Sequence, residues 1–273
     1  MNTVSPAGAL NQLATMKTTV EKAIILSAGQ GRRLSPLTDN RPKCLIELSG
    51  RTVLHWQLHH LALAGITETV VVTGFGADQV EAEIARVAPA GMTVRTIFNP
   101  FYGLTDNLAT CWLVREEMRG PFLLLNGDTL FEPAIAQKLL TAPEAAITVT
   151  IDRKASYDAD DMKVFTDGPR LLAIGKTISH YDAESIGFLR FSAEGAASFV
   201  RMVEAALRKP EGLKRWYLSA INEMAEAGAD VRVASIQGLE WAEMDFPEDV
   251  SRNMRLTAGW AEAEALAASR EVA

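Results

Sequence analysis

The sequence predicts an α/β fold: a Rossmann-like mixed, mostly parallel sheet with helices on both faces and a small antiparallel β insertion. Two observations lead to this prediction. From residue 20 onward, short runs rich in β-branched residues alternate with amphipathic helical stretches, the pattern of a parallel sheet covered on both faces. The alternation lapses after Ile151, where two β-like runs flank the turn at residues 167–169, and this lapse indicates the insertion.

The expected elements follow in chain order. Strands are predicted at residues 22–27, 68–73, 93–98, 121–126 and 146–151, and helices at 53–64, 77–88, 105–118 and 133–141. The insertion covers about residues 153–191 and ends in a strand at 185–191, after which helices are predicted at 193–208, 214–227 and 247–269 and strands at 230–236 and 240–244. We therefore expect a loose leader at 1–20, one domain at 21–255, and a helix end with a tail at 256–273.

Composition narrows the class of protein. A formal net charge of −7 argues against general affinity for nucleic acid, so any phosphate ligand must be held by local basic residues. The two cysteines, Cys44 and Cys111, fit neither a disulfide framework nor a metal-binding spacing, which favours a reducing compartment. Residues 1–20 lack a signal-peptide pattern, and no apolar run approaches the ~20 residues of a membrane span. These observations predict a cytoplasmic protein without a membrane partner.

The most informative stretch covers residues 23–43. It begins as an apolar run that predicts a buried strand, and a glycine-rich, doubly basic loop follows. Gly29 and Gly31 allow the backbone to approach an anion closely, while Arg32 and Arg33 supply positive charge. The loop is therefore interpreted as a phosphate-binding loop. An ordinary surface turn is the alternative, because short glycine motifs have many false positives.

Two acidic residues follow predicted strands. Asp128 ends the run Asn126-Gly127-Asp128 after an apolar strand, where open α/β sheets bind ligands. Asp245 follows a second short strand and precedes Pro247. Taken singly, each has a common structural role as a turn former or helix cap. Taken together, they offer two hard oxygen ligands for Mg²⁺, as phosphoryl or nucleotidyl transfer requires.

Spacing excludes two better-known phosphate loops. Leu34 stands where a dinucleotide fingerprint needs a third glycine, and the Gly-Lys-Ser/Thr of a Walker A loop is absent. The remaining pattern, SAGQGRRLSPLT at residues 27–38 with Pro-Lys at 42–43, resembles the signature of the nucleotidyltransferases that join a nucleoside triphosphate to a phosphorylated small molecule. Ser27 is the one departure from the family's A-A-G-x-G-x-R-L-x-P-L-T motif, and it replaces one small residue by another.

The middle of the chain resembles one branch of this family. Residues 99–113, 160–188 and 216–222 are similar to segments of cytidylyltransferases that act on phosphocholine and related small phosphate or phosphonate head groups. One departure matters, since Asp106 stands where the branch has the first of two Asn. The resemblance covers about residues 22–255 and implies that the 153–191 insertion is a lid that adds acceptor-binding surface.

The resemblance also implies the roles of single residues. On this basis the expected catalytic residues are Lys43, Arg33, Asp128, Asp245 and Lys163, with Asp128 and Asp245 as the Mg²⁺ ligands. The expected nucleotide-binding residues are Leu26, Ala28, Gly29, Gly31, Arg32, Arg33, Lys43 and Asn107, and the expected acceptor-binding residues are Tyr102, Asp106, Lys163, Glu184, Trp216 and Tyr217.

An ammonium head group requires aromatic faces and a carboxylate. The aromatic candidates are Tyr102, Trp112, Trp216, Tyr217 and Trp241, with Asp106 or Glu184 as the anion. Trp112 lies on an apolar helix face and is interpreted as a core residue. Lys163 is expected to meet the acceptor phosphate, whereas Lys176 is interpreted as a solvated surface lysine. His55, His59 and His60 are interpreted as boundary residues of one helix and not as a metal site.

The resulting hypothesis is transfer of CMP from CTP to phosphocholine, with pyrophosphate as the leaving group and Mg²⁺ as the cofactor. A phosphate oxygen is already nucleophilic at neutral pH, so the expected mechanism is direct in-line attack without a general base. Phosphoethanolamine, an aminoalkylphosphonate or a sugar 1-phosphate remain alternative acceptors, and UTP an alternative donor. A non-catalytic regulatory member is a more distant alternative that would be expected to lose Lys43, Asp128 or Asp245. The oligomeric state is left open, with a homodimer as one option.

Overall fold

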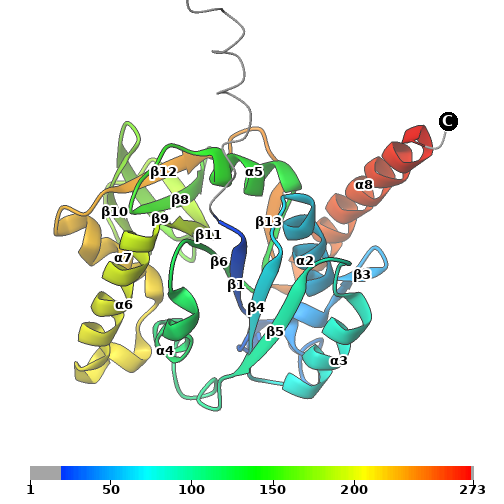
Figure 1. Ribbon diagram of the computed structural model, residues 1–273, viewed down its shortest axis with the longest axis horizontal. Coiled ribbons are helices and arrows are strands. Elements are labelled where there is room, and N and C mark those ends of the chain that lie inside the picture. Colours follow the sequence, from blue (N-terminus) through cyan, green and yellow to red (C-terminus); the bar gives the residue numbers. More distant parts are fainter. Residues whose placement is uncertain (1–19, 272–273) are drawn as a thin grey trace, which may run out of the picture.

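The computed structural model describes residues 20–271, so all but the last residue of the predicted leader lies outside the described residues. A nine-stranded mixed sheet runs through the molecule in the order β5-β4-β1-β6-β11-β8-β12-β10-β9 (Figure 1). Its strands are β1 (Lys22–Leu26), β4 (Glu68–Thr73), β5 (Thr93–Phe98), β6 (Phe122–Asn126), β8 (Ile147–Asp152), β9 (Lys163–Asp167), β10 (Arg170–Gly175), β11 (Ala183–Phe191) and β12 (Val231–Ser235).

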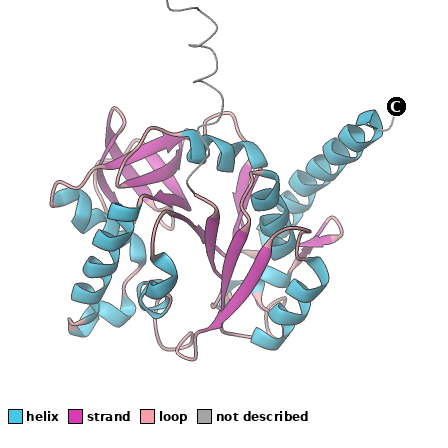
Figure 2. Ribbon diagram, viewed as in Figure 1, coloured by secondary structure: helices cyan, strands magenta, loops and turns pink. Residues whose placement is uncertain are grey.

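Helices cover both faces of this sheet, as predicted (Figure 2). They are α2 (Val53–Leu63), α3 (Ala77–Val87), α4 (Asn107–Leu113), α5 (Pro133–Thr141), α6 (Ala193–Leu207), α7 (Tyr217–Glu226) and α8 (Pro247–Glu271). Residues of β1 alternate between the two faces, since Ala23 and Ile25 pack in the cluster under α2, α3 and α5, and Ile24 packs in the cluster under α4, α6 and α7. This two-sided burial explains why the strand is an apolar run without alternation.

Parallel pairing is confined to part of the sheet. Strands β5, β4, β1 and β6 are parallel, as are β8 and β12, whereas β11 is antiparallel to both β6 and β8. The prediction of a mostly parallel sheet is therefore correct for the N-terminal half and wrong for the C-terminal half. The pairing of β11 depends on residues more than 60 positions apart, and local periodicity carries no signal for that choice.

The antiparallel strands expected in the insertion are present as the β9–β10 hairpin, but both edges of this hairpin join the main sheet. On one edge, β10 pairs with β12, and on the other, β9 pairs with β11. Strands β11, β8, β12, β10 and β9 thereby close into a small barrel. Closure satisfies backbone groups that a free hairpin would expose on its edges.

Two small sheets and four 3₁₀ turns complete the described elements. The small sheets pair β2 (Glu47–Leu48) with β3 (Arg51–Thr52) and β7 (Thr129–Phe131) with β13 (Trp241–Glu243), and the 3₁₀ turns are η1 (Arg32–Leu34), η2 (Lys43–Leu45), η3 (Arg115–Met118) and η4 (Pro210–Lys214). The predicted helix at 105–118 is divided into α4 and η3. The β7–β13 pair was not predicted, and it joins two segments more than 100 residues apart next to the candidate site.

Helix α8 follows β13 and extends away from the body at its C-terminal end (Figure 1). Its buried Trp260 packs edge-on against Trp56 of α2, with ring centroids 5.8 Å apart. Among residues 20–271, no helix combines the length and the apolar character needed to cross a membrane.

Candidate active site

The glycine-rich loop leaves the carboxyl end of β1 and turns sharply toward η1. Gly31 has φ +76°, and a Cβ atom built there would lie 2.8 Å from Cβ of Lys43. A glycine at this position therefore permits both the left-handed backbone and the close approach of Lys43. Thr38 fixes the return of the loop, since its hydroxyl donates a hydrogen bond to the Gly31 carbonyl at 2.8 Å.

The two predicted aspartates meet at the end of β6. Asp128 follows β6, and the β7–β13 pairing brings the backbone of Met244 within 3.1 Å of the Asp128 carbonyl. Asp245 is the next residue, so its carboxylate reaches the same place. The structure thus brings together the two carboxylates that the sequence placed on separate strands.

Lys43 lies between the two carboxylates. Its Nζ is 2.5 Å from Oδ2 of Asp128 and 3.0 Å from Oδ1 of Asp245. Arg33 contacts the other oxygen of Asp245, at 2.8 Å. Asp245 does not cap α8, since Asp249 accepts the backbone N–H groups of residues 245 and 246. The structural alternative for Asp245, a helix cap, is therefore wrong, and its carboxylate is committed to the two cations.

The charges in this cluster perturb one another. Burial opposes ionisation of Asp245, but Lys43 and Arg33 outweigh burial and hold the pKa of Asp245 below its usual range. Burial likewise opposes charge on Lys43, yet Asp128 and Asp245 raise its pKa well above the ordinary value. Burial, together with Asp128 and Asp245, raises the pKa of the nearby Glu243 to about 8. The cluster is thus a cation held by ionised aspartates beside a carboxyl that tends to keep its proton.

Glu243 was not predicted as a site residue. Its position offers a signal, because it lies two residues before Asp245, and alternate residues of an extended segment point to the same side.

The donor set fits a bound Mg²⁺. Oδ1 of Asp128 is buried and has no hydrogen-bond partner among the described residues, and an orphaned carboxylate oxygen of this kind suits a hard cation. No group of three or more His, Cys, Asp or Glu side chains within residues 20–271 forms a metal site by itself. Mg²⁺ is commonly held by one or two carboxylates together with substrate phosphates, so Asp128, which lines a cavity, and Asp245 on the other side of Lys43 are sufficient.

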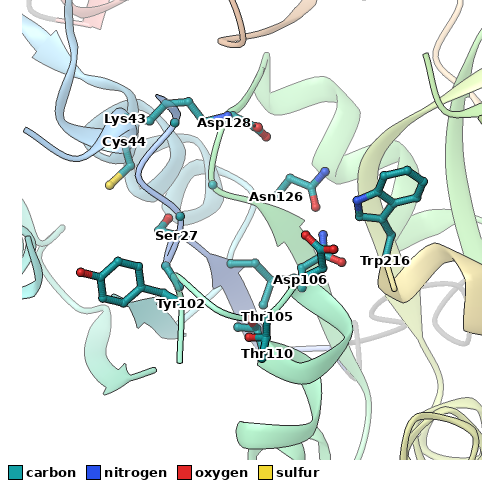
Figure 3. Close-up of a pocket in the computed structure, with 16 residues that line it drawn as sticks. Ser27, Lys43, Cys44, Tyr102, Thr105, Asp106, Thr110, Asn126, Asp128 and Trp216 are labelled. Carbon is teal, nitrogen blue, oxygen red and sulfur yellow. Dashed lines mark hydrogen bonds and ion pairs between the residues drawn. The ribbon is translucent and has the colours of Figure 1, made fainter. Parts of the chain in front are cut away.

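A cavity of about 300 Å³ opens beside this cluster. Figure 3 shows Lys43 and Asp128 at one end of it, with Tyr102 and Trp216 on opposite sides in that view. The residues lining it are Leu26, Ser27, Ala28, Gly29, Gly31, Lys43, Cys44, Tyr102, Thr105, Asp106, Asn107, Thr110, Asn126, Gly127, Asp128 and Trp216. Most of the predicted nucleotide-binding residues are in this set. Lys163, Glu184, Tyr217 and both loop arginines are not.

Two predicted contact residues have structural roles. Tyr217 is fully buried, and its hydroxyl donates to Oδ1 of Asn126 at 3.2 Å. The prediction that its ring faces the acceptor is therefore wrong. The backbone N–H of Tyr217 donates to Oδ1 of Asn107 at 2.8 Å, so the oxygen of Asn107 holds α7 against α4, and its amide nitrogen remains available to the cavity.

Two other predicted placements differ from the structure. Trp112 is 38% exposed and lies under the guanidinium of Arg115, so its interpretation as a core residue is wrong. The helix that carries it is only seven residues long, too short for the periodicity to fix its buried face. Arg32 is exposed and hydrogen-bonds to Gln30, so within the loop Arg33 is the arginine that reaches the acidic cluster.

On the barrel side, Lys163 and Lys176 exchange the roles that were predicted for them. The ammonium of Lys163 is buried and bonded to the carbonyl oxygen of Asp158 at 2.6 Å, so it holds the segment before β9. Lys176 lies over the ring of Trp216, at 4.8 Å, and 3.5 Å from Asp160. The interpretation of Lys176 as a solvated lysine is therefore wrong. Of the two lysines, Lys176, which follows β10, is the one that faces the site.

The fold and the Lys43–Asp128–Asp245 cluster are accompanied by a match to a known protein family. The nucleotidyl transferase family model matches residues 22–161, about half of the chain, and the chain belongs to that family. The prediction of a nucleotidyltransferase is thereby confirmed.

Individual relatives agree with this class. The chain is 33% identical over 236 residues to CMP-5'-(3-aminopropyl)phosphonate synthase of Streptomyces rubellomurinus, a match that covers 84% of this chain and 37% of that protein. It is 31% identical over 111 residues to choline-phosphate cytidylyltransferase of Streptococcus pneumoniae, covering 41% of this chain and 46% of that protein. The chain thus spans less than half the length of these two curated relatives.

A solved structure supports the fold. The inositol-1-phosphate CTP transferase from T. maritima superposes with a TM-score of 0.74 at 20% identity, covering 87% of this chain and 96% of that one. At this identity the likeness concerns the fold alone.

Proposed function

We propose that this chain transfers CMP from CTP to a small phosphate or phosphonate acceptor with a cationic head group, and that pyrophosphate leaves. The observation that carries this proposal is the position of Lys43 between Asp128 and Asp245 at the mouth of the cavity. A cation and two carboxylates beside a glycine-rich loop are suited to binding a triphosphate and its metal ion.

Three basic side chains would neutralise the phosphates. Lys43 and Arg33 contact Asp245 from the loop side, and Lys176 approaches from the barrel side. Negative charge builds up on the phosphates during transfer, so fixed cations on two sides stabilise the transition state. The attacking phosphate or phosphonate oxygen is ionised at neutral pH and needs no base, so these residues bind and orient the substrates.

Mg²⁺, when bound at Asp128 and Asp245, would supply further neutralisation of the triphosphate. The low pKa of Asp245 keeps this carboxylate ionised at neutral pH. The ammonium of Lys43 contacts the same two carboxylates, so Lys43 would share them with Mg²⁺ or turn toward the phosphates when CTP binds.

Phosphocholine is the first candidate acceptor, on the resemblance of residues 99–113, 160–188 and 216–222 to its cytidylyltransferases. An aminoalkylphosphonate is the second candidate. The similarity to the aminopropylphosphonate synthase supports it, because it extends over 84% of the chain. Asp106 also lines the cavity, and its negative charge attracts a cationic acceptor without forming the head-group site itself.

A matrix of donors and acceptors tests the proposal. CTP, UTP, ATP and dTTP are each combined with phosphocholine, phosphoethanolamine, 3-aminopropylphosphonate and glucose 1-phosphate, and pyrophosphate release is followed with Mg²⁺ and with EDTA. We expect Mg²⁺-dependent release with CTP and an amine-bearing acceptor. Preference for glucose 1-phosphate would instead indicate a sugar nucleotidyltransferase, and no turnover with any pair would indicate a non-catalytic member of the family.

A further inference from the structure

On the barrel side, the ammonium of Lys154 lies between two carboxylates and near an aromatic ring. Nζ of Lys154 is 2.8 Å from Oε2 of Glu184 and 2.9 Å from Oδ2 of Asp161, and it lies 5.6 Å from the ring centre of Tyr157. The hydroxyl of Tyr157 donates to the carbonyl of Asp182 at 3.0 Å, which fixes the ring. Two carboxylates and one aromatic face are the groups that recognise a substrate amine.

Glu184 is the unusual member of this group. Its side chain is 4% exposed in a strand that is buried throughout, and burial raises its pKa to about 7 despite the neighbouring Lys154. Oε1 of Glu184 is buried and has no hydrogen-bond partner among the described residues. Lys154 reaches it from the surface with a side chain that is 35% exposed. A primary ammonium carries three N–H donors. An acceptor ammonium in this site could therefore also bond to Oε1 of Glu184, which Lys154 leaves without a partner.

Two cations, Arg33 and Lys176, lie next to this pair of carboxylates. Asp160 precedes Asp161 in the chain, and its carboxylate lies 3.1 Å from Arg33 and 3.5 Å from Lys176. Because Asp160 and Asp161 are successive residues, the two cations at Asp160 and the carboxylates around Lys154 are neighbours on the barrel side. Phosphate-binding cations on one side and ammonium-binding carboxylates on the other are complementary to a zwitterion.

We propose that Glu184 and Asp161 form the ammonium site of a zwitterionic acceptor, and that Lys154 fills this site until the acceptor displaces it. The inference rests on the proposed function, because it assigns the head-group end of the same acceptor. It also predicts the acceptor's orientation, with the phosphate or phosphonate toward Arg33 and Lys176.

Two acceptors that differ only in the amine test this assignment. 3-Aminopropylphosphonate and propylphosphonate are compared with CTP and Mg²⁺. A hydrogen-bonded charge pair of this kind is worth about 10- to 100-fold in binding, so the wild-type KM is expected to be lower for the amine by about that factor. Glu184→Gln and Asp161→Asn should remove most of this preference while leaving the KM for propylphosphonate unchanged. Having two variants keeps the test valid if one of them does not fold.

Substitution of Lys154 should have the opposite effect on the KM for the amine acceptor. Lys154→Gln removes the competing ammonium and is expected to lower the KM for 3-aminopropylphosphonate severalfold, without changing the KM for propylphosphonate. Lys138→Gln is the matched control, because Lys138 is exposed on α5. A rise of both KM values in Lys154→Gln, or an equal change for both acceptors in Glu184→Gln, would overturn the assignment.

Calorimetry separates this inference from the proposed function. If no acceptor supports turnover, the proposed function fails, whereas binding of 3-aminopropylphosphonate to the wild-type chain still reports on the ammonium site. Binding that is about 10- to 100-fold weaker for propylphosphonate than for 3-aminopropylphosphonate, with a difference that disappears in Glu184→Gln, supports the site. No binding of 3-aminopropylphosphonate to the wild-type chain, with or without CTP, contradicts it.

Discussion

Lys43→Met removes an ammonium and preserves much of the length and apolar stem of the side chain. The lysine and its two aspartate partners have side chains that are only 17–20% exposed. Breaking a fully buried ion pair by removing one partner costs about 3–5 kcal/mol, and each hydrogen bond to a charged group contributes about 1.5–3 kcal/mol. Partial exposure reduces both values, so we expect the free energy of unfolding to fall by about 2 kcal/mol in EDTA.

Mg²⁺ should restore more stability to this variant than to the wild-type chain. Without Lys43, Asp128 and Asp245 lose an ammonium that lies 2.5 Å and 3.0 Å from their oxygens, and the metal ion no longer competes with it. A tenfold gain in Mg²⁺ affinity corresponds to about 1.4 kcal/mol at saturating metal. Turnover should remain low even when stability is restored, because the ammonium that neutralises the triphosphate is still missing.

Urea denaturation in EDTA and in Mg²⁺ measures both effects, and pyrophosphate release measures turnover. Lys138→Met on α5 is the matched control and should resemble the wild type in both solutions. The reasoning about the cluster is refuted if Lys43→Met is as stable as the wild type in EDTA, or if Mg²⁺ stabilises the wild type more than the variant.

Three further outcomes follow from the site. Gly31→Ala, which forces a Cβ against Lys43 at φ +76°, should lower the free energy of unfolding by about 1–2 kcal/mol, whereas Gly29→Ala, with open space around it, should leave the melting temperature unchanged. Asp128→Asn should reduce pyrophosphate release by about 10²-fold or more and should lower the free energy of unfolding by less than Lys43→Met does, because Lys43 keeps its contact with Asp245. Glu184→Gln should flatten the decline of stability between about pH 5 and pH 7, which urea midpoints across that range measure. In the wild type, Glu184 holds its proton up to about pH 7, while the unfolded chain releases it near pH ~4.3, so rising pH favours unfolding.

Each of these three predictions has a result that would contradict it. Equal destabilisation by Gly29→Ala and Gly31→Ala would show that the loop does not depend on the left-handed turn at Gly31. Near-normal turnover in Asp128→Asn would remove this aspartate from the proposed metal site. A pH slope in Glu184→Gln as steep as that of the wild type would assign the slope to other groups. The charged and titratable groups around Glu184 are Lys154, Asp161 and Glu243.

The sequence was sufficient where the signal is local. The glycine loop, the strand before Asp128 and the positions of β4 and β5 follow from spacing and burial period within a few residues, and the structure places them as predicted. Lys43 and Arg33 were assigned to the site through a motif that is continuous in the chain.

The sequence was insufficient where two distant segments meet. The β7–β13 pair places Asp245 beside Asp128, and the β8–β11 pair, which sets Glu184 opposite Asp152, places Glu184 near Lys154. Neither pairing has a local signature, so Glu243 and Lys176 were missed as site residues. The exchange between Lys163 and Lys176 has the same cause, because the strand pattern gives a residue's face but not the element that covers it.

Lys43 and Lys154 are expected to respond differently to substrate binding. Lys43 neutralises carboxylates that the reaction also needs, so its charge remains useful when the triphosphate arrives, and its removal should lower turnover. Lys154 neutralises carboxylates that the acceptor itself would neutralise, so its charge becomes a competitor, and its removal should lower the KM for an amine acceptor. In both places an ammonium contacts buried or half-buried carboxylates, which limits the cost of placing negative charge there. Substrate binding then exchanges one cation for another, and the opposite signs expected for Lys43→Met and Lys154→Gln distinguish the cation that takes part in the reaction from the one that must leave.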